Sequence, residues 1–193
     1  MTNSSKLRYN QKMKLTIILG PMKSGKSFDL ISFFSPLKYT ATKYVLYQPK
    51  RNVRDEGIES RSGLTLEAKK IETLEGIADQ DFSIIGIDEM HMFEPSEISH
   101  IEKALAKGKE IIISGLDMDY KGEMFDTIKR LLELGPTEVR YKRAVCNECK
   151  QFSATHTQVY DKGAPITHGM PPVIPDDGTF SYEPVCRLCF ARE

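Results

Sequence analysis

The chain has 193 residues, a length that fits one α/β domain with a small additional module. Its 27 Lys and Arg balance 27 Asp and Glu, so it lacks the global basic character that favours nucleic acid or an anionic membrane surface. No apolar run approaches the roughly 20 residues that a helix needs to cross a bilayer.

Residues 1–12 are polar and lack the apolar core of an export signal, so we expect a disordered tail before the first strand. The four cysteines form two Cys-x-x-Cys pairs. Without an export signal, such pairs favour a reducing compartment and a bound metal over disulfides. We therefore expect a cytoplasmic protein.

The first strong motif is residues 20–27, Gly-Pro-Met-Lys-Ser-Gly-Lys-Ser, which fits the phosphate-binding loop (P-loop) pattern G-x-x-x-x-G-K-[ST]. The glycines let the backbone curl so that its N–H groups face one anion. Lys26 can reach the outer phosphates, and the Ser27 hydroxyl can bind the accompanying Mg²⁺. The apolar run 15–19 predicts a strand before the loop, and residues 28–34 have helical spacing after it. A Gly/Ser-rich turn that matches by chance is the alternative.

A second strand is predicted at 43–47, ending at Pro49, and is followed by the charged stretch 50–63. We expect this stretch to be a loop, because glycines interrupt it and it has no apolar periodicity. In a phosphate-binding enzyme, such a loop can carry an arginine to the phosphates. Arg61 is the candidate for that role, and the alternative is an ordinary solvated connection.

A short strand near 68–71 and a short helix at 74–78 are predicted next. The apolar strand 82–87 then ends in Asp88 and Glu89. After a P-loop in the same chain, an acid in the first position binds Mg²⁺ directly or through water. A second acid beside it can take the proton of the attacking nucleophile. The alternative is a helix N-terminus, which also favours acidic residues.

The remaining core elements are a helix at 95–107, a strand at 110–115, a loop at 116–122 and a helix at 125–134. This alternation of strands and helices predicts a mainly parallel sheet covered by helices, with ligands at the carboxyl ends of the strands. We therefore expect the P-loop, the acid pair and the 116–122 loop to converge at one edge.

The composition changes after residue 137, where two Cys-x-x-Cys pairs enclose a long segment. Four thiolates suit tetrahedral zinc in a closed structural site, and redox dithiols are the alternative. Prolines and glycines exclude a long helix between the pairs, so we expect a large loop with metal-pinned ends, favouring a lid or binding role. The four candidate ligands are Cys146, Cys149, Cys186 and Cys189.

The ordered set of motifs resembles the type II thymidine kinases, the tetrameric, zinc-containing family, over about residues 14–190. The P-loop is close to that family's Gly-Pro-Met-x-Ser-Gly-Lys-Ser, and 87–91 resembles its Ile-Asp-Glu-Ala-Gln. Residues 115–125 resemble Gly-Leu-Asp-x-Asp-Phe-x-Gly-x-Pro-Phe, and 182–189 resemble its closing zinc knuckle.

The resemblance implies an α/β fold: a RecA-like P-loop core at 13–140 and a small zinc-binding domain at 141–193. Within that domain, a lasso at about 150–185 would close over the nucleoside. The implied function is an ATP-dependent thymidine kinase that phosphorylates the 5′-hydroxyl. The implied partners are ATP, thymidine, thymidine triphosphate as feedback inhibitor and further copies in a homotetramer, with no nucleic acid and no membrane.

The resemblance also assigns roles to residues. Glu89 would be the general base, while Ser27 and Asp88 would bind Mg²⁺. The implied ATP-binding residues are Gly20, Pro21, Met22, Lys23, Ser24, Gly25, Lys26, Ser27, Asp88, Glu89, Met90 and His91. The implied thymidine contacts are Met22, Leu116, Tyr120, Phe125, Val173, Ile174 and Tyr182.

Several positions depart from the family pattern. His91 stands where the family has glutamine, and Met92 stands where an aromatic residue often flanks the base. The lasso usually begins Thr-x-Arg, and counting from Cys149 places His156 and Gln158 there. These differences lie around the base and not around the phosphates.

Two further functions fit the generic motifs. One is a P-loop ATPase or regulatory module whose zinc domain docks nucleic acid, and the other is a nucleotide sensor without turnover. The zinc segment is not strongly basic, which argues against docking to nucleic acid.

Overall fold

The computed structural model describes residues 14–52, 58–59, 65–174 and 178–191. The expected tail at 1–12 and the candidate Arg61 lie outside the described residues. Among the helices of the described part, none is both long enough and apolar enough to span a bilayer.

The core is a six-stranded sheet in the order β5-β2-β6-β7-β1-β8, with every neighbouring pair parallel. The predicted α/β class with a mainly parallel sheet is therefore confirmed. Strand β7 lies between β1, which leads into the P-loop, and β6, which leads into the acid pair. The strands are β1 Lys14–Leu19, β2 Tyr44–Pro49, β5 Lys69–Ile71, β6 Ile84–Ile87, β7 Glu110–Gly115 and β8 Glu138–Tyr141.

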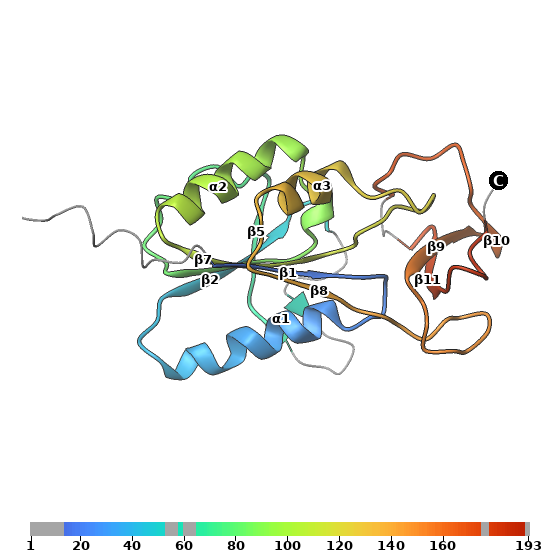
Figure 1. Cartoon of the computed structure of the whole chain (residues 1–193), viewed down its shortest axis with the longest axis horizontal. Helices are drawn as coiled ribbons and strands as arrows, with labels where there is room; N and C mark the ends of the chain where they lie inside the picture. Colours follow the sequence, from blue (N-terminus) through green and yellow to red (C-terminus); the bar gives the residue numbers. More distant parts are fainter. Residues whose placement is uncertain (1–13, 53–57, 60–64, 175–177, 192–193) are drawn as a thin grey trace, which may run out of the picture.

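Helices cover both faces of this sheet, with α1 on one side and α2 and α3 on the other (Figure 1). The strand residues alternate between two buried clusters, since Ile17 packs on the α2/α3 side while Ile18 packs against α1. Helix α1 approaches β6 closely, because a Cβ at Gly86 would lie 2.8 Å from the Phe34 ring. The helices are α1 Lys26–Phe34, η1 Ser35–Tyr39, η2 Met90–Met92, η3 Pro95–Glu97, α2 Ile98–Ala106 and α3 Asp126–Glu133.

The predicted helix at 74–78 is wrong, because this stretch is a series of turns. Gly76 adopts a positive φ of 78°, which breaks a helix, while Leu74 and Ile77 are still fully buried. The predicted helix at 95–107 is divided into η3, which begins at a proline, and the regular α2.

The long segment between the cysteine pairs is not only a loop. It contains β9 His156–Asp161, β10 Ala164–Pro165 and β11 Ser181–Val185, which form an antiparallel sheet in the order β10-β9-β11. We call this the C-terminal sheet; it lies at one end of the core (Figure 1). Proline is tolerated in edge strands, and in β11 the Pro184 carbonyl accepts a hydrogen bond from the Asn147 N–H. A two-stranded pair, β3 Ile58–Glu59 with β4 Thr65–Leu66, completes the described strands.

Candidate active site

The P-loop turns sharply between β1 and α1. Gly20 has a φ of 145°, and a Cβ there would lie 2.6 Å from the Lys142 carbonyl oxygen, so only glycine fits. Gly25 has a φ of 83° at the start of α1. The Lys26 ammonium is buried and donates to the Pro21 carbonyl at 2.8 Å, which folds the side chain back over the loop. Burial lowers the pKa of Lys26, and nearby carboxylates oppose that shift.

The fully enclosed Asp88 carboxylate connects β6 to the P-loop helix. Its Oδ2 accepts from the Ser27 hydroxyl at 3.2 Å, so the two predicted Mg²⁺ ligands lie side by side. Its Oδ1 accepts from the Glu89 N–H at 3.0 Å and from the Ser114 hydroxyl. Burial raises the pKa of Asp88, while these hydrogen bonds and the Lys26 charge act to lower it.

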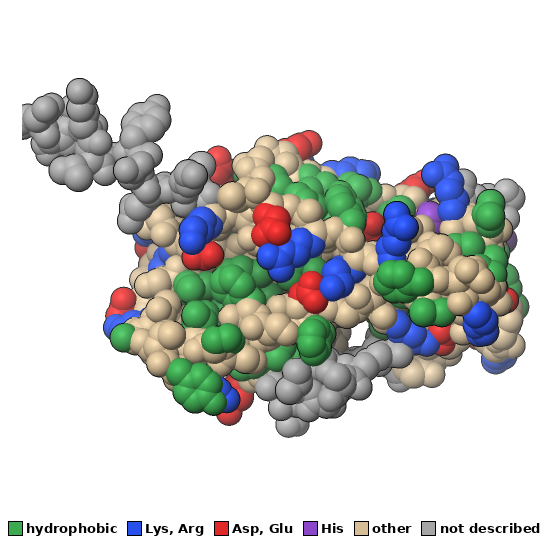
Figure 2. All heavy atoms as spheres, turned by 60° about the horizontal axis from the view of Figure 1, so that its bottom comes forward, with side chains coloured by type: hydrophobic (Ala, Val, Ile, Leu, Met, Phe, Trp, Pro, Cys, Tyr) green, Lys and Arg blue, Asp and Glu red, His purple; other side chains and the backbone are tan. Residues whose placement is uncertain are grey.

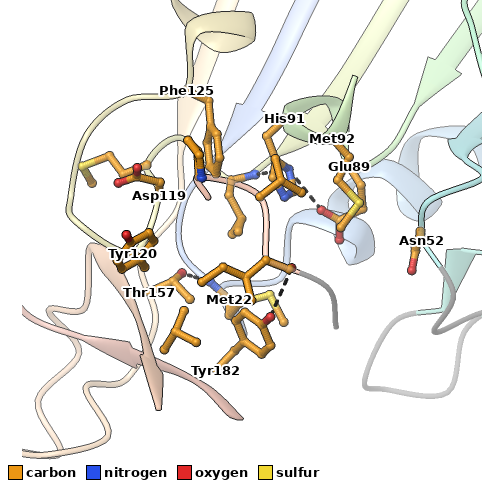
Figure 3. A pocket seen from close by; sticks show the side chains of 16 residues that line it. Met22, Asn52, Glu89, His91, Met92, Asp119, Tyr120, Phe125, Thr157 and Tyr182 are labelled. Carbon is orange, nitrogen blue, oxygen red and sulfur yellow. Dashed lines mark hydrogen bonds and ion pairs between the residues drawn. The ribbon is translucent and has the colours of Figure 1, made fainter. Parts of the chain in front are cut away.

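Glu89 sits in a left-handed backbone conformation, with φ 51° and ψ 42°. For a residue other than glycine this costs on the order of 1–3 kcal/mol, and such strain is found mainly at functional sites. Because of this turn, the side chains of the two adjacent acids point in different directions. Asp88 faces Ser27, whereas Glu89 lines a cavity (Figure 3).

His91 is buried in the cavity wall next to Glu89. Its Nδ1 accepts the Leu116 N–H at 3.2 Å, which places the hydrogen of the neutral ring on Nε2. The ring packs against Phe125 with centroids 4.9 Å apart, and Nδ1 lies 3.4 Å from Glu89 Oε2. Burial lowers the pKa of His91 to about 3, with a further contribution from Lys26, so the imidazole stays neutral near pH 7.

The cavity is lined mainly by apolar side chains with a few polar groups among them, a composition typical of small-molecule sites. Its lining residues come from the carboxyl edge of the core sheet and from the C-terminal sheet (Figure 3). All seven predicted thymidine contacts line it, and they come from distant parts of the chain. They are Met22, Leu116, Tyr120, Phe125, Val173, Ile174 and Tyr182.

Two tyrosines hold the segment 170–174 over this cavity. The Tyr120 hydroxyl donates to the Met170 carbonyl at 2.7 Å and accepts the Met170 N–H at 3.1 Å. The Tyr182 hydroxyl donates to the Ile174 carbonyl at 3.2 Å (Figure 3). Segment 170–174, which we call the lid of the cavity, is therefore hydrogen-bonded to both the core and the C-terminal sheet.

The P-loop also touches the C-terminal sheet directly. The Met22 N–H donates to the Thr157 hydroxyl at 2.9 Å, and Lys23 forms an ion pair with Glu183 in β11. Met22 thus contributes its backbone to the loop and its side chain to the cavity (Figure 3).

Strand β9 contains the residues that the family pattern places at the start of the lasso. Thr157 and Val159 line the cavity, because alternate residues of a strand share a face. His156 instead stacks on Phe190 at 4.6 Å. Gln158 donates to the Ile166 carbonyl at 3.1 Å and accepts the Ala191 N–H at 3.0 Å. The two residues that counting from Cys149 places at the start of the lasso therefore do not line the cavity.

Sequence reasoning also missed other residues of the cavity wall. The period-two pattern of β9 could have revealed the two strand residues, and Met118 and Asp119 belong to the 116–122 loop that was expected at this edge. Met92 stands at a position that often flanks the base in the family, whereas Asn52 and Pro172 lack a local signal. The additional lining residues are Asn52, Met92, Met118, Asp119, Thr157, Val159 and Pro172.

The four cysteines form a separate cluster beside the C-terminal sheet. Their sulfurs all lie within 4.8 Å of one another, and Cys149 Sγ is 3.8 Å from Cys186 Sγ. A tetrahedral zinc with Zn–S bonds of about 2.3 Å also separates its sulfurs by about 3.8 Å. Although burial raises the pKa of Cys146, backbone N–H groups outweigh it and lower the value to about 6. The cluster is compatible with a structural zinc site.

Comparison with known protein families gives one finding that bears on this arrangement. A family model described as thymidine kinase matches residues 13–190, which include the P-loop, the acid pair, the cavity wall and all four cysteines.

Proposed function

The chain belongs to the thymidine kinase family and is thus an ATP-dependent kinase of thymidine, and on that premise we propose a role for each part of the site. Thymidine occupies the cavity under segment 170–174. The ATP phosphates lie in the P-loop. The γ-phosphate passes to the thymidine 5′-hydroxyl where these two regions meet.

The position of Glu89 is the observation that carries this proposal. Glu89 lines the cavity, while its neighbour Asp88 contacts Ser27 of the P-loop helix. The acid therefore stands between the phosphate and nucleoside regions. Glu89 accepts the proton of the 5′-hydroxyl as that oxygen attacks, the role of a general base.

The phosphates would be held by the P-loop N–H groups and by Lys26, whose ammonium would leave the Pro21 carbonyl to reach them. The adjacent oxygens of Ser27 and Asp88 are the hard donors that Mg²⁺ prefers, so these residues would hold the ion. When bound, Mg²⁺ neutralises phosphate charge. Phosphoryl transfer needs mainly such positioning and charge neutralisation from the protein.

The lid keeps water away from the reacting phosphate. Water competes with the 5′-hydroxyl as acceptor, so a closed cavity favours transfer over hydrolysis. The hydrogen bonds of Tyr120 and Tyr182 to segment 170–174 support this role. Tyr120, Phe125 and Val159 supply apolar surface for the base.

The cysteine cluster would bind Zn²⁺ as a closed structural site. Four clustered thiolates would fill the tetrahedral coordination of zinc and leave no open position, and the cluster packs among buried apolar residues such as Ala144 and Phe190. A division into a 13–140 core and a 141–193 zinc domain is supported by the separate C-terminal sheet.

Family membership also supports a homotetramer, feedback inhibition by thymidine triphosphate and a cytoplasmic location. A formal net charge of zero is in keeping with the absence of a nucleic-acid partner. A P-loop ATPase with a zinc ribbon is not favoured, because Glu89 faces a largely apolar cavity of the kind that binds small molecules.

The Glu89→Gln variant tests the role of the base. It keeps the shape of the side chain but cannot accept a proton, so turnover should fall by roughly 10²- to 10⁴-fold, the usual range for general base catalysis. Calorimetric affinities for MgATP and thymidine should stay near those of the wild type. Glu102→Gln on the exposed face of α2 is the matched control. Undiminished turnover in Glu89→Gln would remove Glu89 from the mechanism.

A further inference from the structure

The two oxygens of the Asp88 carboxylate have different surroundings. Oδ1 accepts from the Ser114 hydroxyl and, at 3.0 Å, from the Glu89 N–H. Oδ2 faces the P-loop helix and accepts from Ser27 at 3.2 Å. A carboxylate held through one oxygen by two donors is restrained from rotating, so the other oxygen keeps a fixed direction.

The sheet register explains why Ser114 reaches this carboxylate. Ile87 of β6 pairs with Ile113 of β7, so the next residues, Asp88 and Ser114, lie level with each other. Ile113 belongs to the α2/α3 side of the core, which places Ser114 on the α1 side. Ser27 is in the first turn of α1, so Asp88 lies between two hydroxyl groups on one face of the sheet.

Ser114 is an unusual residue for its position. It is fully buried near the carboxyl end of β7, a central strand of the sheet, and directly follows Ile111, Ile112 and Ile113. A buried hydroxyl requires a hydrogen-bond partner, and here it donates to Asp88, because a carboxylate oxygen accepts. The hydroxyl therefore contributes to the geometry of the site and not to apolar packing.

We propose that Ser114 is a positioning residue for the kinase reaction, which holds Asp88 so that Oδ2 is presented to the metal side of the P-loop. This inference rests on the proposed Mg²⁺ role of Asp88 and Ser27. Through the Glu89 N–H on the same oxygen, it also ties the orientation of Asp88 to the backbone of Glu89. Ser114 acts through Asp88, so its loss should affect divalent cation binding first.

The Ser114→Ala variant tests the inference with Mn²⁺ as a paramagnetic probe. Free Mn²⁺ is measured by electron paramagnetic resonance in the presence of a non-hydrolysable ATP analogue. The Kd for Mn²⁺ should rise roughly tenfold, the lower end of the effect of losing a partner that orients a metal ligand. Affinity for the metal-free analogue should stay unchanged, and Ser114→Cys, which keeps a weak donor, should give an intermediate Kd.

Thr127→Val is the matched control. Thr127 is also buried, and its hydroxyl donates to the Phe93 carbonyl at 2.6 Å, so the variant loses a comparable hydrogen bond outside the site. Its Kd for Mn²⁺ should equal that of the wild type. A Kd within twofold of wild type in folded Ser114→Ala would overturn the inference. If Ser114→Ala does not fold, Ser114→Cys is used instead, and a Kd for Mn²⁺ within twofold of wild type in that variant would overturn the inference.

The experiment separates this inference from the proposed function. If the wild-type protein with the analogue fails to bind Mn²⁺, the proposed metal site itself is wrong. If the wild type binds Mn²⁺ and the Ser114 variants bind it equally well, only the role of Ser114 is wrong.

Discussion

At the scale of single residues, the site depends on the directions in which two adjacent acids point. The sequence motif predicted that both would be functional, since an acid pair follows an apolar strand in a P-loop chain. The left-handed backbone conformation of Glu89 turns the two side chains toward different parts of the site, and no sequence pattern predicts that conformation. The supporting hydroxyl of Ser114 was equally hidden, because a serine inside an isoleucine-rich strand has no motif of its own.

His91 provides a residue-scale prediction about pH. Its pKa is about 3 in the folded protein, below an ordinary value of 6.5. As pH falls below 6.5, His91 binds a proton in the unfolded chain but stays neutral in the folded protein. The contribution of neutral His91 to the free energy of unfolding is therefore complete above pH 6.5. Between pH 6.5 and pH 3 it falls by about 1.4 kcal/mol per pH unit, the value for one proton.

Urea unfolding between pH 7 and pH 4 would measure this effect. The free energy of unfolding of His91→Gln should decline less steeply with falling pH than that of the wild type. His168→Gln removes an exposed histidine and controls for the substitution itself. If the free energy of unfolding fell equally steeply with pH in the wild type and in His91→Gln, the account would be contradicted.

At the scale of elements, the core strands and helices were largely predictable. Strands β1, β6 and β7 are short apolar runs buried on both faces, and turn residues bound them clearly. The failures had local causes. Gly76 broke an expected helix. The prolines near 165–184 concealed β10 and β11, and the sequence between the cysteine pairs was therefore expected to be a loop.

The four-cysteine cluster, which is compatible with a zinc site, yields an element-scale prediction. Zinc contributes on the order of 10 kcal/mol of binding energy in small zinc modules, comparable with the stability of a whole domain. Chelation or Cys186→Ala should therefore unfold the C-terminal sheet and abolish thymidine binding, because Thr157 and Tyr182 lose their positions. Nucleotide binding at the P-loop should weaken much less.

Calorimetric titration of both ligands measures this difference. Leu188→Ser is the matched control, since Leu188 lies in the same knuckle between two cysteines and is almost fully exposed. Full thymidine affinity in zinc-free protein would contradict a structural role for the metal.

At the scale of the whole molecule, the site is a meeting of segments far apart in sequence. Met22 from the P-loop, Phe125 from the core and Tyr182 from the C-terminal sheet share one cavity wall. Parallel-sheet topology predicted the convergence of the P-loop, the acids and the 116–122 loop. The placement of the C-terminal sheet depends on tertiary contacts such as Met22 with Thr157. The sequence anticipated it only through the expected lid or binding role of the long segment and through the family resemblance.

The central claim is that this shared cavity takes the nucleoside that receives the phosphate. Its most direct test is phosphate transfer by the purified protein with Mg²⁺ and γ-labelled ATP. The acceptors are thymidine, deoxyuridine, deoxycytidine, two purine deoxynucleosides, and none. We predict labelled thymidine monophosphate, formed much faster than ATP is hydrolysed without an acceptor. Hydrolysis of ATP at one rate, whichever nucleoside is present, would contradict the account.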